Sequence, residues 1–177
     1  MALPNFLRPN YFVGKLLGVD DFRREQEYHR EKNRLRNRLV VGTGVLAGLR
    51  VAVDGQELVV SPGVAIDCQG NELVLEAEYR QPLPDKSGRH FVTVRYAEVQ
   101  GPSIPIPSDS FEDSSAPDYT EETVTIEVQQ SLPAFPSHTI DANLQGCAEP
   151  HAICLATITC KASRWRVVSS RSRHRHK

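Results

Sequence analysis

The chain has few aromatic residues and no long apolar run. Aromatic residues make up 7% of its 177 residues, and only one of them is tryptophan. The longest apolar runs fall far short of the roughly 20 residues that a membrane helix needs. Residues 1–7 also lack the basic start of a secretory signal. We therefore expect no membrane span, no export signal, and assembly of the protein in the cytoplasm.

The signature motifs of common enzyme classes are also missing. The chain has no Gly-x-Ser-x-Gly, no His-Glu-x-x-His, no phosphate-binding loop and no dinucleotide fingerprint. Its net charge of -1 does not suggest a general polyanion binder. These absences predict a protein that is not an enzyme, has no cofactor and binds no nucleic acid. A basic tail, residues 169–177, could still contact phosphates or an acidic protein surface.

The four cysteines include no Cys-x-x-Cys pair. Cys147, His151, Cys154 and Cys160 supply four soft ligands, but their spacing is not that of a zinc knuckle. Cys154 and Cys160 share one strand parity among apolar neighbours, as buried core thiols do. We therefore predict no metal site, and we keep a metal-dependent hydrolase as an alternative that elemental analysis would remove.

One helical segment opens the chain. Asp20 and Asp21 suit a helix N-cap and first turn, because carboxylates accept hydrogen bonds from the unpaired N–H groups there. Gly42 and Gly44 suit the end of a helix. The pattern predicts a helix from about Asp20 to about residue 39.

Beyond residue 48 the apolar period changes from 3.6 to 2. Asp54-Gly55 is a hairpin signal, and Ser61-Pro62-Gly63 is a turn signal. The alternation predicts short antiparallel strands at 49–53, 58–60, 64–66, 73–75, 92–96, 124–128, 153–159 and 165–168. The predicted fold is α+β, with an N-terminal surface helix packed on an antiparallel β-sandwich or small barrel that carries long irregular loops.

We divide the chain into three parts. Residues 1–47 form a turn-and-helix assembly module, residues 48–168 form the β-domain, and residues 169–177 form a flexible basic tail. Within the β-domain, residues 101–122 are rich in proline and acidic residues. They predict a long acidic loop or arm between two strands, which lacks the ligand pattern of a calcium loop.

The predicted helix carries an unusual polar seam. Plotted at 100° per residue, one face excludes every charge and begins and ends with apolar residues. Its members are Phe22, Gln26, His29, Asn33, Asn37 and Val40. Buried amides and imidazoles need partners, which a strand edge or another subunit can supply. We predict a subunit interface made of the first five of these residues and, on the acidic arm, Glu112 and Asp113. The alternative is a half-exposed polar face without a partner.

Three blocks of the sequence carry a family resemblance. The first is residues 10–17 (Asn-Tyr-Phe-Val-Gly-Lys-Leu-Leu) followed by 20–32 (Asp-Asp-Phe-Arg-Arg-Glu-Gln-Glu-Tyr-His-Arg-Glu-Lys). The second is 34–39 (Arg-Leu-Arg-Asn-Arg-Leu) with 42–51 (Gly-Thr-Gly-Val-Leu-Ala-Gly-Leu-Arg-Val), and the third is 60–75. Together they resemble proteins associated with phage tails and phage-tail-like contractile injection systems. The chain departs from that family at Gly18, where relatives carry a Ser or Thr helix cap, and at 41–44, where an aromatic residue is usual.

The resemblance covers about the first 75 residues. It implies a non-enzymatic structural subunit at or around the baseplate, present as a ring of copies that contact one another and baseplate, sheath or tube subunits. It brings no catalytic residues. A second interpretation is a surface-exposed binding module, either fibre-like or carbohydrate-binding, carried by the particle. Copy number, the neighbours of each face, membrane contact and the kind of particle stay open.

Overall fold

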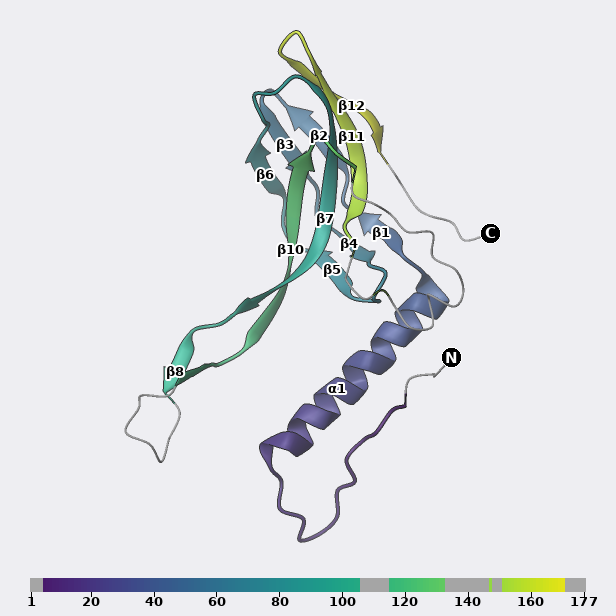
Figure 1. Cartoon of the computed structure of the whole chain (residues 1–177), viewed down its shortest axis with the longest axis vertical. Helices are drawn as coiled ribbons and strands as arrows, with labels where there is room; N and C mark the ends of the chain where they lie inside the picture. Colours follow the sequence, from purple (N-terminus) through teal and green to yellow (C-terminus); the bar gives the residue numbers. More distant parts are fainter. Residues whose placement is uncertain (1–4, 106–114, 133–146, 148–150, 171–177) are drawn as a thin grey trace.

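The computed structural model describes residues 5–105, 115–132, 147 and 151–170. Figure 1 shows a β-domain from whose lower end two long elements project. One is the N-terminal helix and the other is a β-ribbon. Among the described residues, no helix is both long and apolar enough to span a membrane.

Helix α1 runs over Val19–Arg36 and continues into a short π-helical segment, η1, at Asn37–Val41. Asp21 caps its start, because the Asp21 carboxylate accepts a hydrogen bond from the Gly18 N–H at 3.1 Å. Gly42, with φ of 79°, ends the helical stretch, and its N–H donates to the Asn37 carbonyl. The predicted helix is therefore present, although its last five residues widen into a π-turn.

The strands form antiparallel sheets. The first contains β1 (Gly44–Gly48), β4 (Gly63–Ile66) and β5 (Glu72–Leu75), in the order β1-β4-β5. The second contains β2 (Val51–Asp54), β3 (Glu57–Val60) and β6 (Tyr79–Pro82), in the order β2-β3-β6. The third, in the order β10-β7-β11-β12, contains β7 (Gly88–Gln100), β10 (Thr120–Gln129), β11 (Ile153–Lys161) and β12 (Arg164–Ser170). Each sheet is open-edged, so the described strands form no closed barrel.

The hydrophobic core is shared between these sheets. Leu58 and Val60 on β3 and Val92 and Val94 on β7 are fully buried, as is Ile158 on β11. Alternating apolar residues face the core, as the period of 2 predicts. Strand β11 is buried on both faces over most of its length, also as predicted. The α+β prediction is confirmed, with an open sheet system in place of the barrel alternative.

The acidic segment predicted as a long loop or arm is a β-ribbon where the structure describes it. Strands β7 and β10 pair through ten residue pairs, from Thr120 with Gln100 to Gln129 with Phe91. Past them, β8 (Ser103–Pro105) pairs with β9 (Ser115–Pro117), and the Gly101 N–H donates to the Tyr119 carbonyl. We call this outer part of the hairpin, residues 101–105 and 115–119, the arm.

Candidate functional site

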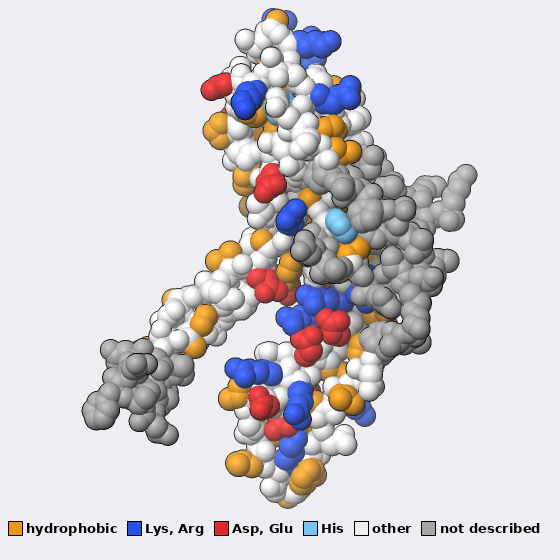
Figure 2. Space-filling model, in the orientation of Figure 1, with side chains coloured by type: hydrophobic (Ala, Val, Ile, Leu, Met, Phe, Trp, Pro, Cys, Tyr) orange, Lys and Arg blue, Asp and Glu red, His pale blue; other side chains and the backbone are white. Residues whose placement is uncertain are grey.

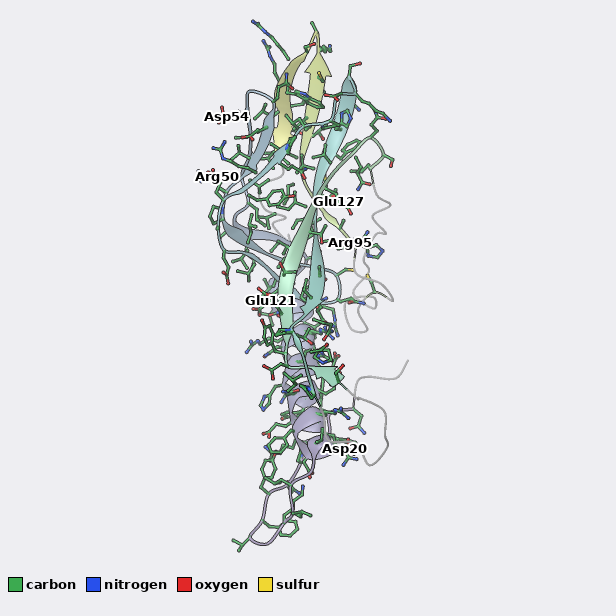
Figure 3. The ribbon with its side chains drawn as sticks, turned by 90° about the vertical axis from the view of Figure 1, so that its left-hand side faces the viewer. Asp20, Arg50, Asp54, Arg95, Glu121 and Glu127 are labelled. Atoms are coloured by element: carbon green, nitrogen blue, oxygen red, sulfur yellow. The ribbon has the colours of Figure 1, made fainter. Side chains whose placement is uncertain are left out.

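The helix and the arm diverge from the β-domain as the two prongs of a fork (Figure 1). The 90° view shows helix and arm in one narrow column, with Glu121 near the top of the helix and Asp20 near its lower end (Figure 3). The fork is therefore flat. None of the 18 residues of α1 is buried, so the helix meets the β-domain only through its last turn and η1. This differs from the expected helix lying along a sheet.

A tight turn at 67–71 anchors the helix. Asp67 is fully buried, and its Oδ1 accepts from the N–H groups of Gln69 and Asn71, both at 2.9 Å. Its Oδ2 accepts from the Asn71 side-chain amide at 2.8 Å. Carboxylates that accept backbone N–H groups form strong local hydrogen bonds. Asp67 therefore makes this turn rigid, and we call residues 67–71 the socket.

Three side chains from the end of the helix bind the socket. Arg34 Nε donates to Asn71 Oδ1 at 2.7 Å, and Asn37 Nδ2 donates to the Gly70 carbonyl at 3.0 Å. Arg38 Nη1 donates to the Gln69 carbonyl at 2.6 Å. Arg38 is 7% exposed, and burial lowers the pKa of its guanidinium because it disfavours the charged form. The helix is thus held by polar bonds rather than by apolar packing.

Gly70 permits this close approach. Its φ is +87°, and a Cβ built there would lie 2.3 Å from the Arg34 carbonyl oxygen. Real Cβ contacts are essentially never under 3.0 Å. Only glycine fits at this crossing of the helix and the socket.

A cleft lies at the base of the fork, where helix and ribbon separate. Its volume is about 270 Å³. It is lined by Arg30, Asn33, Arg34, Asn37, Gly70, Asn71, Glu72, Tyr96 and Glu122. Figure 2 shows basic and acidic side chains gathered in this region. Burial is the main factor that raises the pKa of the Tyr96 hydroxyl, and the hydrogen bond that Tyr96 donates to Glu98 is the second. Tyr96 is therefore a neutral donor at physiological pH.

The predicted seam divides in two. Asn37 is 5% exposed and is bound inside the chain, to Gly70 and to Glu72 Oε1 at 3.2 Å. Phe22, Gln26, His29 and Asn33 are exposed. Of the five helix residues predicted at an interface, Asn37 thus finds its partners within the chain, and the other four stay predicted interface residues. Glu112 and Asp113 lie outside the described residues.

The far end of the helix prong is apolar and exposed. The segment before the helix turns back and runs beside α1. An ion pair between Lys15 Nζ and Asp21 Oδ1 at 2.7 Å and a hydrogen bond from the Tyr11 hydroxyl to the Glu25 carboxylate hold it there. The Glu25 carboxylate raises the pKa of Tyr11 to about 12. The exposed apolar residues here are Phe12, Val13, Leu16, Leu17, Val19 and Phe22. We call them the apolar tip. Sequence reasoning missed it, although all of its members except Val19 fall in the first block of the resemblance.

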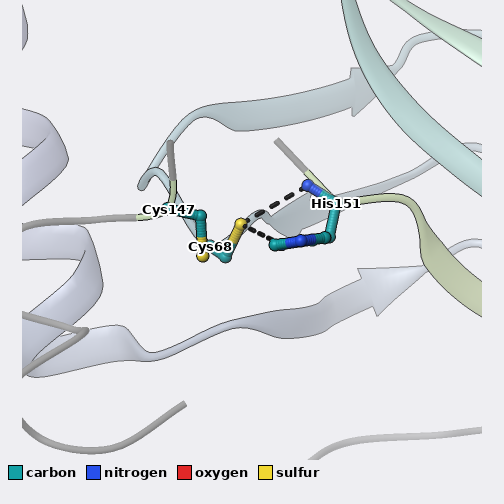
Figure 4. A group of neighbouring side chains, drawn as sticks. All are labelled: Cys68, Cys147 and His151. Carbon is teal, nitrogen blue, oxygen red and sulfur yellow. Dashed lines mark hydrogen bonds between the residues drawn. The ribbon is translucent and has the colours of Figure 1, made fainter. Parts of the chain in front are cut away.

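The structure also gathers three potential metal ligands that the sequence analysis did not group. Cys68 in the socket lies beside Cys147 and His151, and the ligand atoms of all three lie within 4.8 Å of one another (Figure 4). Cys160 instead belongs to the hydrophobic core, and Cys154 is buried with its thiol 3.7 Å from the Ala156 carbonyl oxygen. The pKa of Cys68 is raised to about 12, mainly by burial and secondly by the contact with Cys147. An activated catalytic thiol has a lowered pKa, so Cys68 is not poised as a nucleophile.

No protein-family model matches the chain, and no curated protein matches it. Its fold is similar to that of a chain in the cryo-electron microscopy structure of the type VI secretion system TssK-TssF-TssG baseplate subcomplex. The TM-score is 0.54 and the identity 12%, over 92% of this chain. A chain of another structure of the type VI secretion baseplate complex matches with a TM-score of 0.49 and 10% identity, over 93% of this chain. This chain spans 60% and 58% of the length of those two chains, and at such identities the likeness concerns the fold alone.

Proposed function

We propose that this protein is a non-enzymatic structural subunit of the baseplate of a contractile injection system. In this proposal several copies form a ring, and each copy uses its fork to fix a neighbouring baseplate subunit. The protein assembles in the cytoplasm and then becomes part of a phage-tail-like particle.

The observation that carries the proposal is the apolar tip on an unburied helix. Leu16 is 92% exposed, Phe12 68% and Phe22 54%, at the end of a prong with no buried residue. Contiguous exposed apolar side chains on a soluble protein mark a surface that another molecule covers. The socket fixes the base of the prong by three polar bonds, so the tip is presented by a rigid element rather than by a loose terminus.

The other features agree with this role. The fold resembles that of a chain in a type VI secretion baseplate subcomplex, and three sequence blocks resemble proteins of contractile particles. The arm carries the exposed Asp118, and the adjoining start of β10 adds the exposed Glu121 and Glu122. Helix α1 carries exposed arginines. We propose that the acidic arm of one copy faces the basic helix of the next, because opposite patches favour and orient association. Glu112 and Asp113 continue this charge along the sequence.

A sugar-binding module is less well supported. Stacking on a sugar needs an exposed aromatic ring near polar groups. Trp165 is 8% exposed within the hydrophobic core, which leaves Tyr119, 54% exposed on the arm, as a candidate ring outside the apolar tip. A surface-exposed binding module, fibre-like or carbohydrate-binding, is therefore the second candidate, and glycan-array binding by the intact protein would favour it.

The decisive experiment places a charge in the apolar tip. Leu16→Asp and Phe22→Asp should each abolish or strongly reduce occupancy of this subunit in purified particles, because an aspartate cannot be buried in an apolar contact without a large desolvation cost. Val168→Asp is the matched control, since Val168 is 60% exposed on strand β12, away from the fork. Circular dichroism of the isolated variants should match that of the wild type.

Occupancy is read by quantitative mass spectrometry of particles. Equal loss in all three variants would indicate general damage, and full occupancy in the two tip variants would refute the proposed use of the tip. Charge reversal at Glu121 and Glu122 tests the ring contact separately: normal yield and occupancy would remove the helix–arm contact and leave the tip contact standing.

A further inference from the structure

Cys68, Cys147 and His151 form a compact set of soft donors outside the apolar tip and the fork cleft. The Cys68 sulfur lies 3.0 Å from His151 Nδ1. The ligand atoms of all three residues lie within 4.8 Å of one another (Figure 4). Two of them come from a segment about 80 residues further along the chain than Cys68, so only the fold brings them together.

We propose that these three side chains bind a thiophilic divalent cation, Zn²⁺, through two thiolates and one imidazole. Two cysteines and a histidine are a recurrent ligand set for zinc. The two thiols release their protons to solvent as the ion binds, so the site gains the ion in exchange for protons. Three protein ligands leave one position of a tetrahedral ion for water or a further donor.

The spacing of the ligand atoms suits this ion. With Zn–S of about 2.3 Å and Zn–N of about 2.0 Å, a tetrahedral site places its ligand atoms roughly 3.5 to 3.8 Å apart. The Cys68 sulfur and His151 Nδ1 lie 3.0 Å apart, and no pair of the three ligand atoms is more than 4.8 Å apart. Small side-chain rotations would therefore bring all three atoms to coordination distance of one ion, with its fourth position left open.

The surroundings hold the ligands in place. Cys68 lies inside the socket, between Asp67 and Gln69. The Gln69 N–H donates to Asp67 Oδ1 at 2.9 Å, and this bond fixes the backbone on either side of Cys68. The backbone N–H of His151 donates to the Cys68 sulfur at 3.4 Å, a contact that would stabilise a metal-bound thiolate. Gln69 Nε2 donates to the Cys147 carbonyl at 3.0 Å. Ligands positioned by such outer contacts lose little freedom when a metal binds.

The ion would join two parts of the fold. Cys147 and His151 lie just before strand β11, and Cys68 lies in the socket that holds α1. A bound ion would cross-link the entry of β11 to the socket, and so stiffen the base of the helix prong.

The test uses the reduced full-length chain with Zn²⁺ and, as a spectroscopic probe, Co²⁺. The wild type should bind one equivalent of zinc. Its cobalt form should show the intense visible bands of a tetrahedral site and a thiolate-to-cobalt charge-transfer band in the near ultraviolet. Cys147→Ser and His151→Ala, both at half-buried positions, should each weaken zinc binding by about 100-fold or more, measured by competition with a chromophoric chelator.

Cys160→Ala is the matched control, since Cys160 is a core cysteine outside the cluster, and it should bind zinc as the wild type does. Zinc should raise the melting temperature of the wild type and Cys160→Ala, but not of His151→Ala. Substoichiometric zinc in the wild type would overturn the proposal. Stoichiometric binding that survives in Cys147→Ser and His151→Ala would also overturn it, because the ion would then sit elsewhere, such as at His174 and His176 of the tail.

Discussion

Replacing Gly70 with alanine should release the helix from the socket. Gly70 has a φ of +87°, and an added Cβ would lie 2.3 Å from the Arg34 carbonyl oxygen. The neighbouring group is helix backbone, which cannot rotate away as a side chain can. The helix end must therefore move, and the hydrogen bonds from Arg34, Asn37 and Arg38 to the socket are broken or stretched.

The expected loss of stability follows from these contacts. Placing a non-glycine residue at positive φ costs about 1 kcal/mol. Losing three hydrogen bonds costs about 1 kcal/mol each, or about 3 kcal/mol together. The total is about 4 kcal/mol in the free energy that holds the helix end to the socket. Amide hydrogen exchange of residues 34–41 reports this local opening, and urea unfolding reports the part that reaches global stability.

Gly55→Ala is the matched control. Gly55 also has a positive φ, +60°, but a Cβ there meets nothing within 4 Å. It should cost only the backbone term of about 1 kcal/mol, without faster exchange in the helix. If Gly70→Ala and Gly55→Ala lower stability by the same amount, or if exchange at 34–41 is unchanged in Gly70→Ala, the account of the socket is wrong.

Two further predictions concern the helix start and the β11–β12 turn. Two hydrogen bonds lower the pKa of Asp21 below its ordinary value of 3.8: mainly the one from Lys15, and secondly the one from the Gly18 N–H. A carboxylate with a lowered folded-state pKa stabilises at higher pH, and this contribution is lost as the pH falls through the folded pKa. Intrinsic amide exchange slows as the pH falls, so the readout is the protection factor relative to an unstructured peptide at the same pH. Protection of the first amides of α1 should decrease below about pH 4 in the wild type, and Asp21→Asn should show low protection at every pH; a wild-type protection factor that does not change with pH would contradict this. Ala162 and Ser163, with φ of 48° and 57°, form the two-residue turn between Lys161 and Arg164. The double change Ala162→Asn and Ser163→Gly supplies the residues that such turns favour and should raise the free energy of unfolding by about 1 kcal/mol, measured in urea, whereas a decrease would refute the turn assignment.

The sequence predicted the elements that follow simple periodic rules. The helix start at Asp20 and Asp21, its end at Gly42 and the Asp54-Gly55 hairpin are all found where expected, or within a residue or two. Each depends on local chemistry: caps, positive φ, and alternation over a buried sheet.

The strands of the arm were not predicted, and the reason is physical. A two-stranded ribbon that projects from the domain buries neither face, so it needs no apolar alternation. Ile104 and Ala116 pair between prolines and serines, and proline is depleted in strands, so Ile104 alone gives no alternating signal. The position of the helix was missed for a similar reason. Its attachment depends on polar bonds to the socket, about 33 residues away in sequence, which no helix plot reveals.

The grouping of the three proposed metal ligands lay beyond local reasoning for a different cause. Cys147 and His151 were noted for their spacing, but their partner proved to be Cys68, at a sequence separation of 83 from His151. Cys154 and Cys160, which are nearer in sequence, point into the buried interior. A spacing pattern finds ligands within one loop, whereas this set is assembled from two segments that meet only in the fold.

The most direct test of the proposed function is cryo-electron microscopy of particles from cells with and without this gene. The account predicts that particles lacking the protein keep tube and sheath but lose a ring of forked densities at the baseplate, and that the apolar tip in the wild-type map is covered by a neighbouring subunit. Complete particles that contain no copy of this chain would contradict it.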